Sequence, residues 1–144
     1  MKVVIQRSKK SAVLFNNQKN EIDFGIVVLV GFTEGDDEKT IDYIVNKILN
    51  LRIFDDQDGV MNKSLIDING SILSIPQFTL YADTEKGRRP SYIKALDPKK
   101  ATKLYDLFNQ KIKENNINLK QGLFGAEMEV KITNDGPVTI IIER

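Results

Sequence analysis

The sequence predicts an α+β protein in which two helices pack on a β-sheet or barrel. Three β-rich runs come first, at 1–7, 11–16 and 25–32. Two amphipathic helical patterns follow, and further β-rich runs separate and follow them. The resulting order is β-β-β-α-β-α-β-β, which leaves the order of strands within the sheet open. A chain of 144 residues has the length of one domain, so we expect a single domain over 1–144.

Each helix has a clear start and one apolar face. Gly35-Asp36-Asp37 introduces the first helix, and Asp97-Pro98 places an N-cap and a first-turn proline before the second. The apolar residues of the first helix are Ile41, Ile44, Val45, Ile48 and Leu49. Those of the second are Ala101, Leu104, Tyr105, Phe108 and Ile112.

Three β-rich stretches lie in the second half of the chain. Residues 71–81 predict a strand, and Pro76 inside it favours an edge or bulged strand. Residues 127–133 alternate between apolar and charged side chains, a pattern typical of a half-buried strand. Asn134-Asp135-Gly136-Pro137 is expected to break that strand, and 138–142 to form the last one.

Composition excludes several kinds of chemistry. The chain has no Cys and no His, so it offers no disulfide, no thiolate, no Ser-His or Cys-His pair and no Cys/His zinc site. Catalysis would then depend on carboxylates, hydroxyls, amides, backbone groups or the substrate. The first residues lack the apolar run of a signal peptide, and the longest apolar stretch, 26–30, is too short to span a bilayer. We therefore expect a cytoplasmic protein with no membrane partner.

The acidic loop Asp55-Asp56-Gln57-Asp58-Gly59 invites comparison with a calcium loop. If Gly59 takes the position of the EF-hand glycine, Phe54 falls on the first ligand position and Leu65 on the twelfth. Neither side chain can bind a cation, so a polar turn is the better interpretation. We expect neither a metal nor a cofactor.

Basic residues concentrate between 86 and 103, although the net charge of the chain is only +1. Seven basic side chains stand there against one acid, Asp97. Within this stretch, Lys86-Gly87-Arg88-Arg89-Pro90-Ser91 has arginines that can contact phosphate oxygens and a glycine that permits close approach. A solvated helix start balanced by acidic neighbours explains the same charges.

Two further segments have ordinary interpretations when taken alone. Gln77-Phe78-Thr79 reads as part of a strand with Thr79 facing solvent, and no histidine is present to activate Thr79 as a nucleophile. Gly136-Pro137 reads as a turn between hairpin strands.

Taken together, however, these segments resemble the D-aminoacyl-tRNA deacylase family. Two stretches resemble its signature segments, Ile75-Pro76-Gln77-Phe78-Thr79-Leu80 and Asn134-Asp135-Gly136-Pro137-Val138-Thr139. The same order and similar spacing hold for Val4-Ile5-Gln6-Arg7, Asn50-Leu51-Arg52-Ile53-Phe54, Tyr81-Ala82-Asp83-Thr84, Lys86-Gly87 with Arg89-Pro90-Ser91, and Gly122-Leu123-Phe124-Gly125-Ala126-Glu127-Met128. The resemblance covers the whole chain.

One position departs from the family pattern. The first signature usually begins Ser-Gln, and Pro76 stands here in place of the serine. Pro-Gln resembles a related branch of the fold that clears L-alanine from mischarged tRNA. That branch also alters the second signature, whereas 134–139 keeps the D-specific form. An L-alanyl-tRNA deacylase, and a nucleic-acid-binding protein without activity, therefore stand as alternatives.

The resemblance implies hydrolysis of the ester that joins a D-amino acid, or glycine mischarged on tRNA-Ala, to the terminal adenosine of tRNA. It implies catalysis at Gln77, Phe78 and Thr79, with backbone N–H groups holding the oxyanion and the ribose 2′-OH assisting. A cis Gly136-Pro137 bond would enter the active site of the partner in a homodimer and exclude L-amino acids.

The remaining binding residues follow from the same resemblance. Phe124 and Met128 match positions that line the adenine site, although both are also ordinary core residues by type. Lys86, Arg88 and Arg89 would contact the tRNA.

Overall fold

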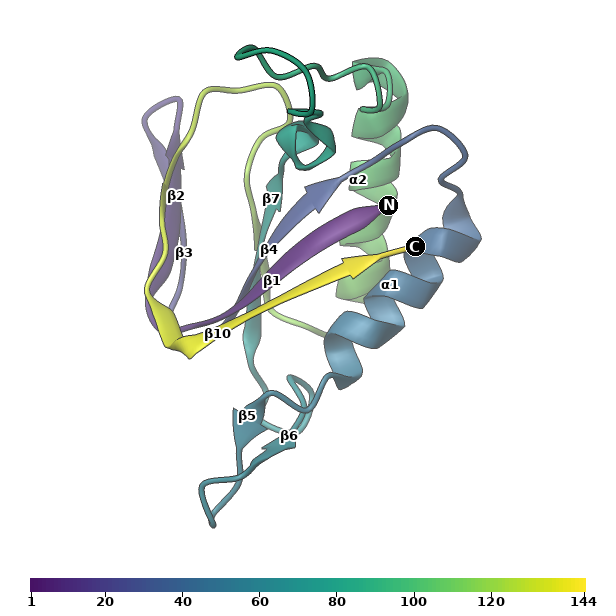
Figure 1. Ribbon diagram of the computed structural model, residues 1–144. Helices are drawn as coiled ribbons and strands as arrows, with labels where there is room; N and C mark the ends of the chain where they lie inside the picture. Colours follow the sequence, from purple (N-terminus) through teal and green to yellow (C-terminus); the bar gives the residue numbers. More distant parts are fainter.

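The computed structural model describes residues 1–144. It contains two α-helices, one 3₁₀ helix and ten strands (Figure 1). In chain order they are β1 (Lys2–Ser8), β2 (Ser11–Phe15), β3 (Gln18–Ile22), β4 (Gly25–Gly31), α1 (Glu38–Asn50), β5 (Phe54–Asp55), β6 (Met61–Lys63), β7 (Ser71–Pro76), η1 (Phe78–Tyr81), α2 (Pro98–Glu114), β8 (Leu119–Gln121), β9 (Glu129–Lys131) and β10 (Asn134–Glu143).

The strands form two open sheets and a small hairpin. The larger sheet has five strands in the order β10-β1-β4-β7-β8, and the smaller has three in the order β3-β2-β9. In the larger sheet β1 is antiparallel to β10 and to β4, whereas β4, β7 and β8 are parallel. The prediction of a helix-covered sheet is confirmed, and the structure has open sheets rather than a closed barrel.

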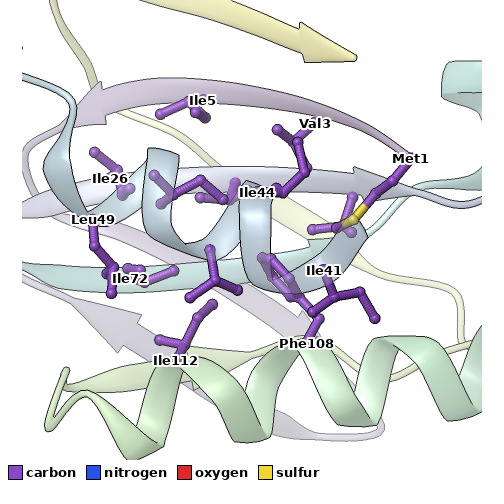
Figure 2. Packing of buried hydrophobic residues seen from close by; sticks show 14 of the residues in the cluster. Met1, Val3, Ile5, Ile26, Ile41, Ile44, Leu49, Ile72, Phe108 and Ile112 are labelled. Atoms are coloured by element: carbon purple, nitrogen blue, oxygen red, sulfur yellow. The ribbon is translucent and has the colours of Figure 1, made fainter. Parts of the chain in front are cut away.

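Both α-helices cover one face of the larger sheet (Figure 1). Their apolar faces meet the strands in a core cluster of 21 buried residues. Figure 2 shows side chains from β1, β4 and β7 pointing toward side chains from both helices, among them Val3, Ile5, Ile26, Ile72, Ile41, Ile44, Leu49, Phe108 and Ile112. Burial of one such aliphatic side chain contributes about 1.5–3 kcal/mol, so this interface holds the helices on the sheet.

Both predicted helix starts are confirmed. The Asp37 carboxylate accepts a hydrogen bond from the Thr40 backbone N–H at 2.9 Å, and the Asp97 carboxylate accepts one from Lys99 N–H at 3.0 Å. Pro98 then occupies the first turn of α2. Each aspartate satisfies a backbone donor that the helix itself leaves unpaired.

The opposite face of the larger sheet is only partly covered. The three-stranded sheet packs against its β4–β7 region through a second cluster, which comprises Val13, Ile22, Val27, Leu73 and Ile75. Along β10, Ile141 is 66% exposed and its neighbours Thr139 and Glu143 are exposed as well. This part of the sheet therefore presents an apolar side chain to solvent.

The expected strand over 71–81 is wrong in two respects. β7 ends at Pro76, and Phe78–Tyr81 forms η1 instead of continuing the strand. β7 is also an inner strand between β4 and β8. Pro76 is tolerated there because it is the last residue of the strand, where the missing N–H interrupts no further ladder bond.

The end of the chain also differs from the expectation. Residues 134–137 do not form a turn outside the sheet, because β10 begins at Asn134 and pairs with Ser8 of β1. The register shifts between Gln6 and Ser8, so an irregularity accommodates Gly136-Pro137 within the strand. The strand expected over 127–133 is confirmed only at Glu129–Lys131.

No helix in the structure combines the length and the apolar composition needed to cross a membrane.

Candidate active site

The candidate site begins where β7 ends. The Gln77 backbone N–H donates to the Val30 carbonyl at 2.7 Å, and the chain then turns into η1. Within that turn, Gln77 Nε2 donates to Thr79 Oγ1. Thr79 is half-buried in a 3₁₀ helix, so the interpretation of Thr79 as a solvent-facing strand residue is wrong.

The start of η1 presents backbone donors. Leu80 N–H donates to the Gln77 carbonyl at 3.2 Å, which is the first bond of the turn. The N–H groups of Phe78 and Thr79 precede it and have no acceptor within the helix. Such a pair of adjacent donors can stabilise a developing oxyanion without any titratable side chain.

Two cavities meet at Phe78. One, of about 270 Å³, is lined by Phe78, Tyr92, Ala95, Leu96, Asp97, Pro98 and Phe124. The other, of about 290 Å³, is lined by Ile75, Pro76, Gln77, Phe78, Gly125, Ala126, Met128 and Val130. The structure thus brings Gln77, Phe78, Phe124 and Met128 around one hollow region, and Phe78 is 53% exposed within it.

A buried tyrosine supports both sides of this region. The Tyr105 hydroxyl on α2 donates to the Ser74 carbonyl of β7 at 2.8 Å, and the same carbonyl accepts from Gly122 N–H at 2.8 Å. The Tyr105 ring lies 6.2 Å from that of Phe124. Burial raises the pKa of Tyr105 to about 12, so the hydroxyl keeps its proton at neutral pH.

Gly136 and Pro137 lie away from these cavities. β10 runs parallel to β7, so its start lies at the end of the sheet where β7 begins, whereas η1 follows the end of β7 (Figure 1). The Gly136-Pro137 peptide bond is cis, as predicted, and both residues are exposed. Within one chain, they cannot reach the cavities at Phe78.

Arg7 braces the segment that carries them, a role that the sequence did not indicate. Its guanidinium forms an ion pair with the Asp135 carboxylate at 3.2 Å and donates to the Ile53 carbonyl at 2.9 Å. A side chain at Gly136 would lie 3.0 Å from Arg7 Nη2, and Gly136 has a φ of +118° that favours glycine. From the other side, Asn134 Nδ2 donates to the Arg7 and Val138 carbonyls, each at 3.0 Å.

Lys86, Arg88 and Arg89 lie in the exposed loop between η1 and α2 (Figure 1). None of them lines either cavity or forms an ion pair within the chain. They are close in sequence to Tyr92, which lines one cavity, but they do not themselves line either cavity.

The acidic loop is a turn. Asp56 Oδ1 accepts from the backbone N–H groups of Asp58 at 2.9 Å and Val60 at 3.1 Å. The structure contains no group of three or more His, Cys, Asp or Glu side chains that could hold a metal ion.

Comparison with solved structures finds the same α+β fold in other proteins. The structure of a protein titled c-Myc DNA Unwinding Element Binding Protein has a TM-score of 0.93 and 38% sequence identity, over 100% of this chain and 99% of that one. A probable eukaryotic D-amino acid tRNA deacylase has the same fold, with a TM-score of 0.83 and 19% identity over 98% and 97% of the two chains.

Sequence comparison is more specific. The family described as D-Tyr-tRNA(Tyr) deacylase matches residues 4–143. D-aminoacyl-tRNA deacylases of Bacillus cereus (strain B4264) and Bacillus cytotoxicus (strain DSM 22905) are each 49% identical to this chain over 144 residues, which is 99% of both chains. The chain belongs to the D-Tyr-tRNA(Tyr) deacylase family, and its resemblance to that family is thereby confirmed.

Proposed function

We propose that this protein hydrolyses the ester bond of D-aminoacyl-tRNA and releases a D-amino acid and free tRNA. The single observation that carries this proposal is the 49% identity with D-aminoacyl-tRNA deacylases over 99% of both chains. The whole chain, 1–144, would act as one catalytic domain. We also propose that the enzyme is cytoplasmic.

The proposed chemistry relies on positioning. An aminoacyl ester is already activated, so the enzyme chiefly has to place a water molecule and stabilise the tetrahedral oxyanion. The backbone N–H groups of Phe78 and Thr79 are the proposed oxyanion donors, and the Gln77 side chain holds the turn through Thr79 Oγ1. The terminal ribose 2′-OH would serve as the proton-transferring group that the chain lacks.

The terminal adenosine would occupy the hollow region around Phe78. Phe124 lines one of its two cavities and Met128 the other. A ring and a thioether are suitable contacts for the face of a base. Lys86, Arg88 and Arg89, exposed in the adjoining loop, would contact phosphates of the tRNA.

Chiral selection would require a second subunit. The start of β10 and η1 lie at opposite ends of the sheet in one chain, and a two-fold axis perpendicular to the strands exchanges those ends. Packing of the open sheet face around Ile141 against its copy would then bring Gly136-Pro137 of each chain toward Phe78 of the partner. The homodimer is therefore part of the proposal.

In that position, Gly136 and Pro137 would fill the space that an L side chain needs. Selection then arises from exclusion of the wrong enantiomer, and D side chains point away from the obstruction. Glycine has no side chain to exclude, so glycyl-tRNA mischarged on tRNA-Ala is a second proposed substrate.

The test of substrate class compares D-tyrosyl-tRNA with L-alanyl-tRNA. The Pro76-Gln77 pair resembles the branch that acts on L-alanyl-tRNA. Comparing the two substrates therefore separates the two deacylase activities. We expect rapid release of D-tyrosine and slow release of L-alanine in single-turnover assays. Faster release of L-alanine would replace the D-specific assignment with the L-specific one.

A second candidate function is binding of nucleic acid without hydrolysis. It is favoured by one observation, the 38% identity with a protein titled as a DNA unwinding element binding protein. Tight binding of charged tRNA with no release of any amino acid would support it over the deacylase.

A further inference from the structure

Two exposed aromatic rings lie against each other beside the candidate active site. The rings of Phe78 and Tyr92 meet edge to face, with centroids 5.1 Å apart and planes at 69°. Phe78 is 53% exposed and Tyr92 is 41% exposed. Side chains of this size normally bury most of their area, so a pair that leaves ring surface open suggests a binding partner.

The two rings form one wall of the cavity that contains Phe124. Tyr92 and Phe124 line this cavity together with Phe78, and so does Pro98 at the start of α2. Tyr92 therefore lines the same cavity as Phe124, but it is not one of the residues proposed above to contact the terminal adenosine.

Cations without an ion-pair partner lie on both sides of Tyr92 along the chain. Lys86, Arg88 and Arg89 precede Tyr92 in its loop, and Lys99 and Lys103 follow it on the first turns of α2. None of these five takes part in an ion pair within the chain, whereas Lys94 pairs with Asp83 at 3.1 Å and Lys100 with Glu34 at 3.3 Å. The free charges complement a phosphate backbone.

Exposed rings beside free cations are the combination that binds single-stranded nucleic acid, because bases stack on the rings while phosphates meet the charges. Duplex RNA keeps its bases stacked inside and offers no such face. We propose that Tyr92, supported by Phe78 and these five cations, binds the unpaired 3′ nucleotides of tRNA that precede the terminal adenosine. This inference rests on the proposed function and assigns to Tyr92 a role in holding the RNA end.

The test uses uncharged RNA, so that binding is measured without hydrolysis. Fluorescence anisotropy compares a hairpin with a short single-stranded 3′ end against the same hairpin with a blunt end. The wild-type protein should bind the hairpin with the single-stranded end more tightly. Tyr92→Ala should weaken that binding about tenfold, since one base–aromatic stack is worth roughly 1–3 kcal/mol, and leave the blunt hairpin unchanged.

Two further substitutions at the same position isolate the ring. Tyr92→Phe should retain the preference for the single-stranded end, and Tyr92→Leu, which keeps apolar bulk, should lose it. The matched control is Tyr43→Ala on α1, because Tyr43 is 38% exposed and contacts Lys47 and Arg144 rather than the cavity. Tyr43→Ala should bind both hairpins as the wild type does.

Three results would overturn the inference: equal wild-type affinity for the two hairpins, full retention of the preference in Tyr92→Ala, or an equal loss for both hairpins. Failure of the proposed function gives a different result. A protein that prefers the single-stranded end through Tyr92 but releases no D-amino acid would retain the binding surface and lose the deacylase assignment. If the protein releases D-amino acid but Tyr92→Ala keeps the preference for the single-stranded end, the deacylase assignment stands and the role of Tyr92 is wrong.

Discussion

At the scale of single residues, the groups available for chemistry at the end of β7 are backbone amides and a hydroxyl without a base. Thr79 Oγ1 accepts a hydrogen bond from Gln77 Nε2, and no histidine exists in the chain to remove its proton. A nucleophilic role for Thr79 has no activating partner. The proposed mechanism therefore assigns the oxyanion to N–H groups that side-chain substitution leaves in place.

Thr79→Ala tests this directly. We expect kcat to fall by less than about tenfold, because the substitution removes one side-chain hydrogen bond worth roughly 1 kcal/mol. A nucleophile or its equivalent would cost about 10⁴-fold or more. Single-turnover kinetics on D-tyrosyl-tRNA provide the measurement, and an acyl group trapped on Thr79 would refute the mechanism.

Arg7 is the residue whose substitution should affect selectivity from the far end of the sheet. Its side chain is buried, and it joins Asp135 to the Ile53 carbonyl. Arg7→Gln leaves these partners without their cation, which should cost about 3 kcal/mol of stability. Loosening of Gly136-Pro137 should also reduce the ratio of D- to L-tyrosyl-tRNA hydrolysis by at least about tenfold, equivalent to roughly 1.4 kcal/mol.

Lys9→Gln is the matched control for Arg7. Lys9 pairs with the other oxygen of Asp135 at 3.2 Å, but its side chain is 65% exposed, and such surface pairs contribute about 0–1 kcal/mol. Melting temperature and selectivity should both stay near their wild-type values. If Arg7→Gln changed stability and selectivity as little as Lys9→Gln, Arg7 would have no role in holding Gly136-Pro137.

At the scale of secondary-structure elements, the loop 86–94 and the start of α2 form the charged side of the site. Arg88→Ala and Lys99→Ala should each weaken tRNA binding and flatten the dependence of log K on log salt by about one unit per lost phosphate contact. Lys113→Ala, exposed at the other end of α2, should leave the slope unchanged. If the slope is unchanged in all three variants, Arg88 and Lys99 are ordinary solvent-exposed residues that do not contact tRNA phosphates.

The helices could be predicted from sequence because their signals are local. Asp37, Asp97 and Pro98 start them, and the spacing of apolar residues defines their buried faces. Strands β3, β6 and β8 gave no such signal, since their residues are largely polar and they form through pairing with distant partners. η1 was missed because Phe-Thr-Leu-Tyr has the composition of a strand.

The arrangement of the candidate site could be predicted only in part. Gln77, Phe78, Phe124 and Met128 followed from the resemblance, and the structure gathers them around two cavities. Arg7 did not, because its role depends on contacts with Ile53, Asp55 and Asp135, which lie far away in the chain. The role of a buried arginine on a strand can be recognised only when the residues that contact it in the folded structure are known.

At the scale of the whole molecule, the chain should lose stability in acid but not near neutral pH. Hydrogen bonds from Thr40 hold the pKa of Asp37 below its ordinary value, and those from Ser64 do the same for Asp67. A lowered pKa means that the folded state is favoured above the unfolded value, near about pH 4, and loses that advantage as pH falls through the folded value.

The melting temperature should therefore decline below about pH 4 and stay level between about pH 5.5 and 8, where no histidine titrates. Differential scanning calorimetry across this range is the measurement. Asp37→Asn should reduce the acid-dependent part, because asparagine still caps α1 but carries no charge. A step in melting temperature near neutral pH would contradict this prediction.

Hydrolysis of D-tyrosyl-tRNA and L-tyrosyl-tRNA by the same wild-type protein measures its selection between enantiomers. The two substrates carry the same side chain on the same tRNA, so a difference in kcat/KM reports chirality alone. Exclusion of L side chains by Gly136-Pro137 should make hydrolysis of the D form at least about 100-fold faster, equivalent to roughly 2.8 kcal/mol. Equal rates, or a preference for the L form, would contradict it.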